Sequence, residues 1–278
     1  MTTIPLRDVG FELEPAKVPR DWVLGDPFQT AFINGLSLLF PEGERFFIDS
    51  VKRMQSRLTD PELRRAVQGF IGQEAMHGRE HRAFNKLVVA HGYRAAPRIE
   101  RRLRRFLDFL RRRLPARSQL AITCALEHFT AMLGQTLLSD ARLREGIDDD
   151  VAGLWLWHAL EETEHKAVAF DVYRAIGGGY LRRASMMVLT TIGFFIAVAI
   201  VQTRLMANRG ILWRPWRWGR GLVRMWIYPG YLTRLVPPYL SYFRPGFHPD
   251  DRDTRALVDS WRQELFGADG TLRPLAGS

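Results

Sequence analysis

Glu74-Ala-Met-His77 and Glu162-Thr-Glu-His165 are the two most informative stretches of this sequence. Both lie in segments whose apolar residues recur with helical spacing, and residues three apart on a helix share one face. Each stretch therefore presents one carboxylate and one imidazole to the same point. About 30 to 35 residues upstream, a further glutamate lies in another helical pattern, Glu44 before the first tetrad and Glu127 before the second.

Two helices that each carry a Glu-x-x-His tetrad, with two helices that each carry one glutamate, form the ligand set of a carboxylate-bridged dinuclear metal site in a four-helix bundle. The sequence shows no alternation of apolar and polar residues long enough to predict a β-strand. We therefore predict an all-α fold in which four helices surround two metal ions.

The first two helices have clear end signals. The first is expected over residues 27–58, with Asp26 as its N-cap and a kink or break at Pro41. The second is expected to begin near Pro61, after a capping signal, and to run to about residue 91, where glycine follows.

The remaining helices follow in order. A basic amphipathic helix over residues 98–114 is expected to cross between the two helix pairs, and nine arginines lie between positions 98 and 117. The third bundle helix is expected over residues 118–140. The fourth is expected to begin after Asp148–Asp150, whose negative charge suits a helix N-terminus, and to end at Gly177.

Four glutamates on core-facing positions would destabilise a metal-free bundle, because a buried carboxylate is costly unless it is paired or bound to a metal. Two divalent ions would remove most of that cost. Nitrogen and carboxylate oxygen ligands suit iron or manganese and, less well, zinc. The alternative, solvated Glu–His pairs, is disfavoured by the apolar residues around both tetrads. The predicted metal ligands are Glu44, Glu74, His77, Glu127, Glu162 and His165.

Other polar residues lie close to these ligands. Glu161 is four residues before His165 and competes with Glu162, which is preferred because it matches the register of the first tetrad. His81 and His158 each lie one turn from a ligand, where they could orient it, relay protons or bind a further metal. His158 or Glu161 could also serve as a general base. The predicted catalytic residues are His158, Glu161 and His81; ordinary interior histidines are the alternative.

The net charge of +10 is concentrated between residues 172 and 249, which contain eleven arginines and neither Asp nor Glu. Within that segment Ala184–Val201 has no charged side chain and would be about 27 Å long as a helix, near the lower limit for spanning a bilayer. Arginine and tryptophan beside an apolar helix are typical of a membrane interface. Nucleic-acid binding is not expected, because it would not explain the uncharged stretch.

Arginines flank this stretch on both sides, and prolines interrupt the apolar residues that follow it. We therefore expect a monotopic or re-entrant arrangement. Packing of this helix on the bundle, or on a second subunit in a homodimer, is the alternative. The expected location is the cytoplasmic face of a bacterial inner membrane, or the cytoplasm.

Four regions follow from these patterns: a loose N-terminal arm over residues 1–25, a metal-binding helical bundle over 26–179, a basic apolar helical region over 180–249 and a polar tail over 250–278. Cys124 is the only cysteine, which excludes an intramolecular disulfide. The N-terminal segment lacks the apolar core of a signal peptide.

Five segments resemble a bacterial family catalogued as predicted metal-dependent hydrolases: PEGERFF (41–47), QEAMHGREH (73–81), ALEHFTA (125–131), HALEETEHKAVAFDVY (158–173) and YFRPGFHP (242–249). The resemblance covers roughly residues 25 to 250 and implies no particular substrate. The ligand pattern also resembles that of the ferritin-like di-iron carboxylate proteins, most of which handle O₂. The expected fold is therefore a ferritin-like four-helix bundle with a basic crossover helix and a C-terminal apolar and amphipathic helical appendage.

The preferred functional interpretation is a di-iron enzyme at or near the membrane that oxidises a hydrophobic, lipid-like substrate with O₂, because four carboxylates can balance the charge of two irons that change oxidation state. The alternative is a metal-dependent hydrolase that uses a metal-activated water. A third interpretation is non-enzymatic, an iron store or a membrane scaffold. No Gly-x-Ser-x-Gly elbow or phosphate-binding glycine loop offers competing chemistry.

Overall fold

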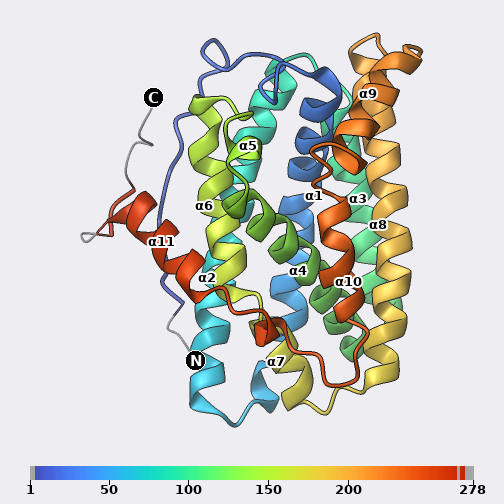
Figure 1. Cartoon of the computed structure of the whole chain (residues 1–278). Coiled ribbons are helices and arrows are strands. Elements are labelled where there is room, and N and C mark those ends of the chain that lie inside the picture. Colours follow the sequence, from blue (N-terminus) through green and yellow to red (C-terminus); the bar gives the residue numbers. More distant parts are fainter. Residues whose placement is uncertain (1–3, 268–269, 273–278) are drawn as a thin grey trace.

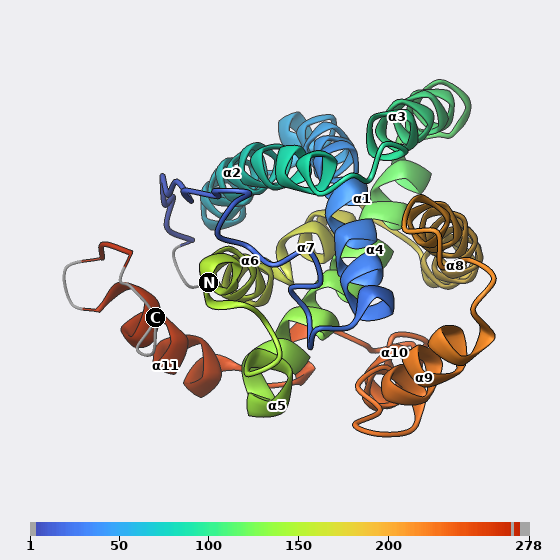
Figure 2. The ribbon, with the colours of Figure 1, turned by 90° about the horizontal axis from the view of Figure 1, so that it is seen from above.

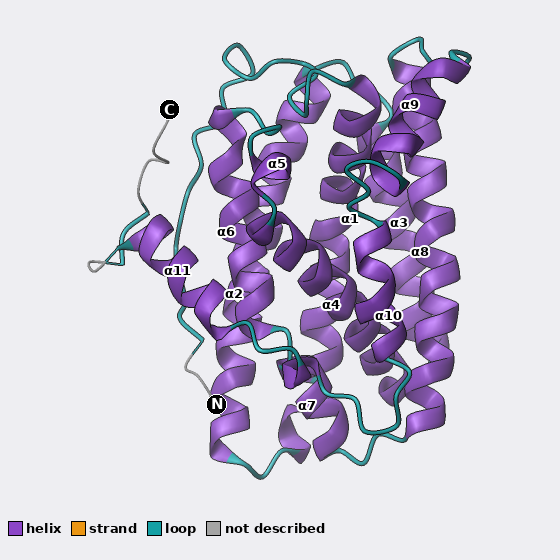
Figure 3. Cartoon of the chain, in the orientation of Figure 1, coloured by secondary structure: helices purple, strands orange, loops and turns teal. Residues whose placement is uncertain are grey.

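The computed structural model describes residues 4–267 and 270–272. These residues form helices, turns and loops, and within them no β-strand occurs (Figure 3). One isolated antiparallel bridge joins Val23 to Ile147. The predicted all-α class is confirmed.

Four long helices lie side by side and form the centre of the molecule (Figures 1 and 2). They are α1 (Pro27–Lys52), α2 (Pro61–Ala90), α4 (Ala116–Ser139) and α6 (Asp149–His165). α1 packs mainly on α2, and α4 packs mainly on α6. A side chain at Gly134 would lie only 2.8 Å from the carbonyl oxygen of Ala159, so glycine permits the close approach of α4 to α6.

Aspartates cap three of these helices, as their sequence positions predict. The side chain of Asp26 accepts hydrogen bonds from the backbone N–H groups of Phe28 and Gln29 at the start of α1. The side chains of Asp60 and Asp148 each accept one backbone hydrogen bond at the start of α2 and α6. Each cap satisfies backbone donors that a helix leaves without partners, which stabilises it by about 1 kcal/mol.

The prediction of a break at Pro41 is wrong, because α1 continues through this residue and ends at Lys52. Proline has no N–H for the carbonyl of the residue four positions earlier. That carbonyl belongs to Ser37, and it accepts a hydrogen bond from Asn85 Nδ2 of α2 at 3.2 Å. A neighbouring helix therefore replaces the missing intrahelical bond.

The fourth predicted helix is divided. α6 ends at His165, and a turn at Lys166 separates it from α7 (Val168–Ala175). The Lys166 ammonium donates to the carbonyl of Arg252 and to Thr254 Oγ1. The apolar periodicity continues across this turn, so the sequence pattern did not reveal the division.

The remaining helices cover the bundle. α3 (Ala96–Arg113) connects α2 to α4, and α5 (Ala141–Arg144) is a short link. α8 (Tyr180–Asn208) packs along α4 and α1, and α9 (Pro215–Trp226) and α10 (Val236–Ser241) follow it on the same side (Figure 2). α11 (Arg255–Phe266) crosses the opposite side. Short 3₁₀ turns occur at Gln55–Arg57, Thr233–Leu235 and Pro249–Asp251.

One helix, α8, is long and apolar enough to cross a membrane by length and composition alone. Only 17% of its most apolar window is buried inside the molecule. α8 nevertheless packs along two helices of the bundle.

Both terminal segments pack on the bundle more closely than expected. The N-terminal arm is not loose, because Trp22 is buried, stacks on Trp155 and donates its indole N–H to Asn34. In the predicted polar tail, α11 buries Leu265 and Phe266 against the bundle. Residues 1–3 of the arm and residues 268–269 and 273–278 of the tail lie outside the described part of the chain.

Apolar residues lie on both sides of the polar centre of the bundle. Along α1, residues 28–38 belong to one apolar cluster and residues 46–51 to another. α2 shows the reverse order, with residues 63–70 in the second cluster and residues 84–88 in the first. Glu44, Glu74 and His77 occupy the interval between the two clusters, and all six predicted metal ligands are buried in the packed interior.

Candidate metal centre

The six residues predicted as metal ligands come together in the middle of the bundle. Ligand atoms of Glu74, Glu127, Glu162 and His165 lie within 4.8 Å of one another, and all four residues are buried. Glu44, Glu74 and His77 form a second group of the same kind. Glu74 belongs to both groups, which is the position of a bridging carboxylate.

The two ligand histidines face the carboxylates directly. His165 Nε2 lies 3.1 Å from Glu74 Oε1 and 3.5 Å from oxygens of both Glu127 and Glu162. His77 Nδ1 lies 3.5 Å from Glu162 Oε1. Four helices thus aim imidazole nitrogens and carboxylate oxygens at one small volume.

Most of these atoms have no hydrogen-bond partner among the described residues. They are both carboxylate oxygens of Glu44, Glu74 and Glu127, Oε2 of Glu162, Nδ1 of His77 and Nε2 of His165. An unsatisfied buried polar group costs about 1 to 3 kcal/mol, and more if it is charged. Nitrogen and oxygen donors that point at one another without hydrogen bonds fit a site that holds metal ions.

The pKa shifts of the four glutamates also fit a metal site. Burial, followed by the negative charge of Glu74, raises the pKa of Glu44 and of Glu127 well above the ordinary glutamate value. Burial and Glu162 also raise the pKa of Glu74. For Glu162, burial acts in the same direction, but the charge of His165 and the contacts with His158, His165 and His77 outweigh it, and its pKa is lowered. Dications would take over the charge balance that protons otherwise supply.

A second layer of residues orients the two histidines. His77 Nε2–H donates to Glu161 Oε2 at 3.0 Å, and His165 Nδ1–H donates to Gln73 Oε1 at 2.9 Å. Each bond leaves the other ring nitrogen facing the carboxylates, as is usual for metal-binding histidines. Burial alone would lower the pKa of His77, but Glu161 and Glu162 raise it to about 10.

The two anchors are related by position in the sequence. Gln73 immediately precedes the ligand Glu74 and holds the histidine of the other tetrad. Glu161 immediately precedes Glu162 and likewise holds His77 of the opposite helix. Gln73 was not among the predicted site residues, although its place before the first tetrad matches that of Glu161 before the second.

Arg7 of the N-terminal arm joins the two anchors. Its guanidinium donates to Glu161 Oε1 at 2.8 Å and to both oxygens of Glu164 at 2.7 and 2.8 Å. Glu164 in turn accepts a hydrogen bond from Gln73 Nε2 at 3.0 Å. Nothing in the sequence pattern indicated that a residue of the arm reaches this network.

Glu161 was expected to act as a general base or to compete with Glu162 as a ligand. The structure places one of its oxygens on Arg7 and the other on His77. Neither oxygen faces the converging carboxylates. These contacts favour Glu162 as the ligand, and those of Glu161 are the contacts of a residue that orients His77.

His81 and His158 form a hydrogen-bonded chain that ends at the centre. His158 Nε2 lies 3.0 Å from Glu162 Oε1, and His158 Nδ1 is hydrogen-bonded to His81 Nε2. His81 Nδ1 lies 2.9 Å from the hydroxyl of Ser37. Burial lowers the pKa of His158 to about 4 and that of His81 well below its ordinary value, and nearby histidines add to both effects. Both side chains are therefore neutral at pH 7.

Comparison with known proteins identifies one family. A family model described as "Predicted metal-dependent hydrolase" matches residues 5–253. No curated protein and no solved structure matches the chain. The family description overturns the preferred sequence interpretation, an O₂-dependent di-iron oxidase, and agrees with its alternative. The metal dependence also agrees with the buried histidine and glutamate clusters. Since the match covers nearly the whole chain, this protein belongs to the family of predicted metal-dependent hydrolases.

Proposed function

We propose that this protein is a hydrolase whose catalytic metals are two divalent ions held at the centre of the bundle. The observation that carries the proposal is the convergence of two histidines and four buried glutamates with unpartnered ligand atoms. The family description supports the reaction class.

The geometry suggests how the ligands divide. Glu74, Glu127, Glu162 and His165 would hold one ion, and Glu44, Glu74 and His77 would hold the other. The carboxylate-rich set suits ferrous iron or manganese better than zinc. Bound ions of this kind lower the pKa of a coordinated water and so supply a hydroxide nucleophile near neutral pH.

His158 is the residue best placed to take up a proton during hydrolysis. Its neutral ring lies against Glu162, within reach of the space beside the ligands. The hydrogen-bonded chain behind it continues from His81 through Ser37, which donates to Asn85 Oδ1 at 2.7 Å. Asn85 then donates to Glu100 of α3 at 2.8 Å, so the chain leads from the buried centre to a partly exposed carboxylate.

The proposal is tested with the purified protein, its chelator-treated form, and that form reloaded with manganese, iron or zinc. Metal content is measured by elemental analysis, and hydrolysis of carboxylic esters, amides and phosphoesters is measured without oxygen. We expect turnover that chelation removes and metal restores. Glu127→Ala should lose one of the two ions and the turnover, whereas Glu145→Ala, on the exposed surface, should keep both ions and the turnover. Absence of turnover with every metal would refute the proposed function.

We also propose that the exposed side of α8 lies on a membrane surface. Its outward residues are apolar and include Leu189, Ile192 and Ile196, each more than half exposed. Arg182 and Arg204, both exposed, lie near its two ends. Because α8 packs along the bundle, an upright α8 would pull the bundle into the hydrocarbon. An orientation parallel to the surface avoids this and brings arginines to anionic headgroups.

Flotation with vesicles tests this placement. The protein should float with vesicles that contain anionic lipids, and Ile192→Glu should abolish flotation. Ser185→Glu, also exposed on α8, is the matched control and should have a smaller effect. Self-association without lipid that Ile192→Glu abolishes would instead assign this surface to a homodimer. Equal flotation of all three proteins would contradict the proposal.

A further inference from the structure

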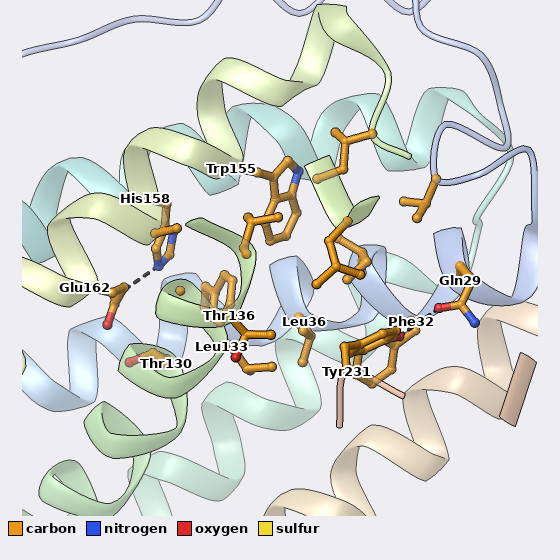
Figure 4. Close-up of a pocket in the computed structure, with 18 of the residues that line it drawn as sticks. Gln29, Phe32, Leu36, Thr130, Leu133, Thr136, Trp155, His158, Glu162 and Tyr231 are labelled. Atoms are coloured by element: carbon orange, nitrogen blue, oxygen red, sulfur yellow. Dashed lines mark hydrogen bonds and ion pairs between the residues drawn. The ribbon is translucent and has the colours of Figure 1, made fainter. Parts of the chain in front are cut away.

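A cavity of about 130 Å³ leads from the edge of the bundle to the candidate metal centre. α1, α4 and α6 form its walls, and His158 and Glu162 line its inner end. Figure 4 shows these two residues at one end and Gln29 with Tyr231 at the other. Leu24, which lines the cavity and is 44% exposed, contributes to the outer rim.

The walls between the two ends are apolar apart from the indole N–H of Trp155, which has no hydrogen-bond partner among the described residues. Phe32, Leu36, Leu133 and Leu137 are typical of the lining. The two threonines in the wall use their hydroxyls within their own helix, where Thr130 donates to the carbonyl of Glu127 and Thr136 to that of Met132.

The polar side chains at the outer end are also satisfied. Tyr231 donates its hydroxyl hydrogen to Gln29 Oε1 at 2.7 Å, and Gln29 Nε2 donates to the carbonyl of Gly221. No charged side chain other than Glu162 lines the cavity. The space therefore offers water few partners and favours a hydrocarbon group.

The volume limits the size of that group. An apolar cavity of about 150 Å³ takes up benzene, which has six carbon atoms. A cavity of similar volume therefore suits an alkyl chain of about six carbons. The polar inner end lies next to the centre at which the proposed reaction occurs.

We infer that this cavity holds the acyl chain of the substrate, and that the substrate is a carboxylic ester with a chain of about six carbons whose carbonyl lies beside Glu162. This inference rests on the proposed function. In the reaction, the oxygen of water forms a bond with the acyl carbon, and the bond from that carbon to the alkoxy oxygen breaks. The alkoxy group leaves as the alcohol with one proton from water, and the acid remains with the chain.

A second apolar cavity competes for the same role. It has a volume of about 340 Å³, lies between α1, α3, α4 and α8, and includes Glu44 in its lining. Leu103 lines only this second cavity, and Leu137 lines only the first, while both residues are partly buried leucines. The same substitution at the two positions therefore distinguishes the cavities.

Binding is measured first, with 1-hexanol and the metal-loaded protein, by isothermal titration calorimetry. Leu137→Trp should weaken hexanol binding at least about tenfold, because the indole fills the cavity, and Leu103→Trp should leave it unchanged. Leu137→Ala enlarges the cavity and should make the protein bind 1-octanol more tightly relative to 1-hexanol. Misfolding cannot produce such a gain in affinity. Circular dichroism and metal content verify that each variant is folded and loaded.

Hydrolysis of p-nitrophenyl esters is the second measurement. The value of kcat/KM should be at least about tenfold higher for the hexanoate than for the acetate, and Leu137→Trp should remove that preference. Hexanol binding without turnover of any ester, amide or phosphoester would refute the proposed function and retain the chain site. Turnover without chain-length preference would refute the chain site and retain the function. Loss of binding in Leu103→Trp alone would place the chain in the second cavity and overturn the inference.

Discussion

The two helix pairs that enclose the centre differ in how they hold their ligands. α2 and α6 contribute both histidines, and each ring is fixed from behind by Gln73 or Glu161. α1 and α4 contribute Glu44 and Glu127, whose oxygens have no hydrogen-bond partner among the described residues. The same two helices supply most of the wall of the apolar cavity.

This difference indicates that the two helix pairs have different roles in metal binding. The imidazoles of α2 and α6 are oriented before any ion arrives, since they already point at the shared volume, whereas the oxygens of Glu74 on α2 have no hydrogen-bond partner among the described residues. The α1–α4 pair offers carboxylates whose position only an ion or a proton would fix. Preorganised nitrogen ligands with adaptable carboxylates suit a centre that must bind metal and still leave room for a substrate.

The largest expected effect concerns the residue shared by both ligand groups. Glu74→Ala should lose both ions, whereas Glu44→Ala should lose one of about two ions per chain. Elemental analysis of the purified variants measures this directly. Glu42→Ala is the control, because Glu42 is also buried on α1 but pairs with Arg45 and Arg104. Equal losses from Glu74→Ala and Glu44→Ala would remove the distinction between the pairs.

The next effect concerns the anchoring of the histidines. Arg7→Met should weaken metal affinity about 10- to 100-fold, because Glu161 loses the cation that positions it and Glu164 is left with the cation of Arg262. Affinity is measured by competition with a chelator. Arg79→Met is the matched control, since Arg79 joins Asp8 of the arm to Glu80 of α2 without touching either anchor. An equal change in both variants would mean that Arg7 only fastens the arm.

A smaller effect is expected on the α1 side, where Asn85 replaces the bond that Pro41 cannot make. Asn85→Leu should lower the free energy of unfolding by about 1 to 3 kcal/mol, because the Ser37 carbonyl loses its donor. In a Pro41→Ala background the cost should be smaller, since alanine restores the intrahelical bond. Urea unfolding of the four proteins gives the coupling energy. Additive costs would show that the bond does not stabilise α1.

The smallest effect is expected at His248, which is not among the residues of the metal centre. A hydrogen bond to Asp171 raises the pKa of His248 above its ordinary value, although burial opposes the shift. The folded state therefore holds this proton more tightly, so the stabilisation is complete below about pH 6.5 and is lost as the pH rises through the folded value. His248→Gln should remove this part of the pH dependence in urea unfolding between about pH 5.5 and pH 8.5. An unchanged profile would contradict the prediction.

Much of the helical framework could be predicted from the sequence. Aspartate caps, glycine after α2 and apolar periodicity predicted the four central helices to within a few residues at most ends. Two predictions about helix ends were wrong, at Pro41 and at His165. α1 continues through Pro41 because a side chain from α2 supplies the missing donor, and α6 ends at His165 although the apolar pattern continues beyond it. Neither the donor from α2 nor the end of α6 is visible in a one-dimensional pattern.

The two tetrads and the two upstream glutamates, Glu44 and Glu127, indicated from the sequence alone which six residues meet, because helical periodicity orients the two ligands of each tetrad toward one face. Only the tertiary structure decided what surrounds them: Arg7 on Glu161 and Glu164, Glu161 turned toward His77, and an apolar cavity that ends at Glu162. These features arise between segments far apart in the chain. Their geometry depends on how whole helices pack, and sequence spacing within one helix carries no information about that packing.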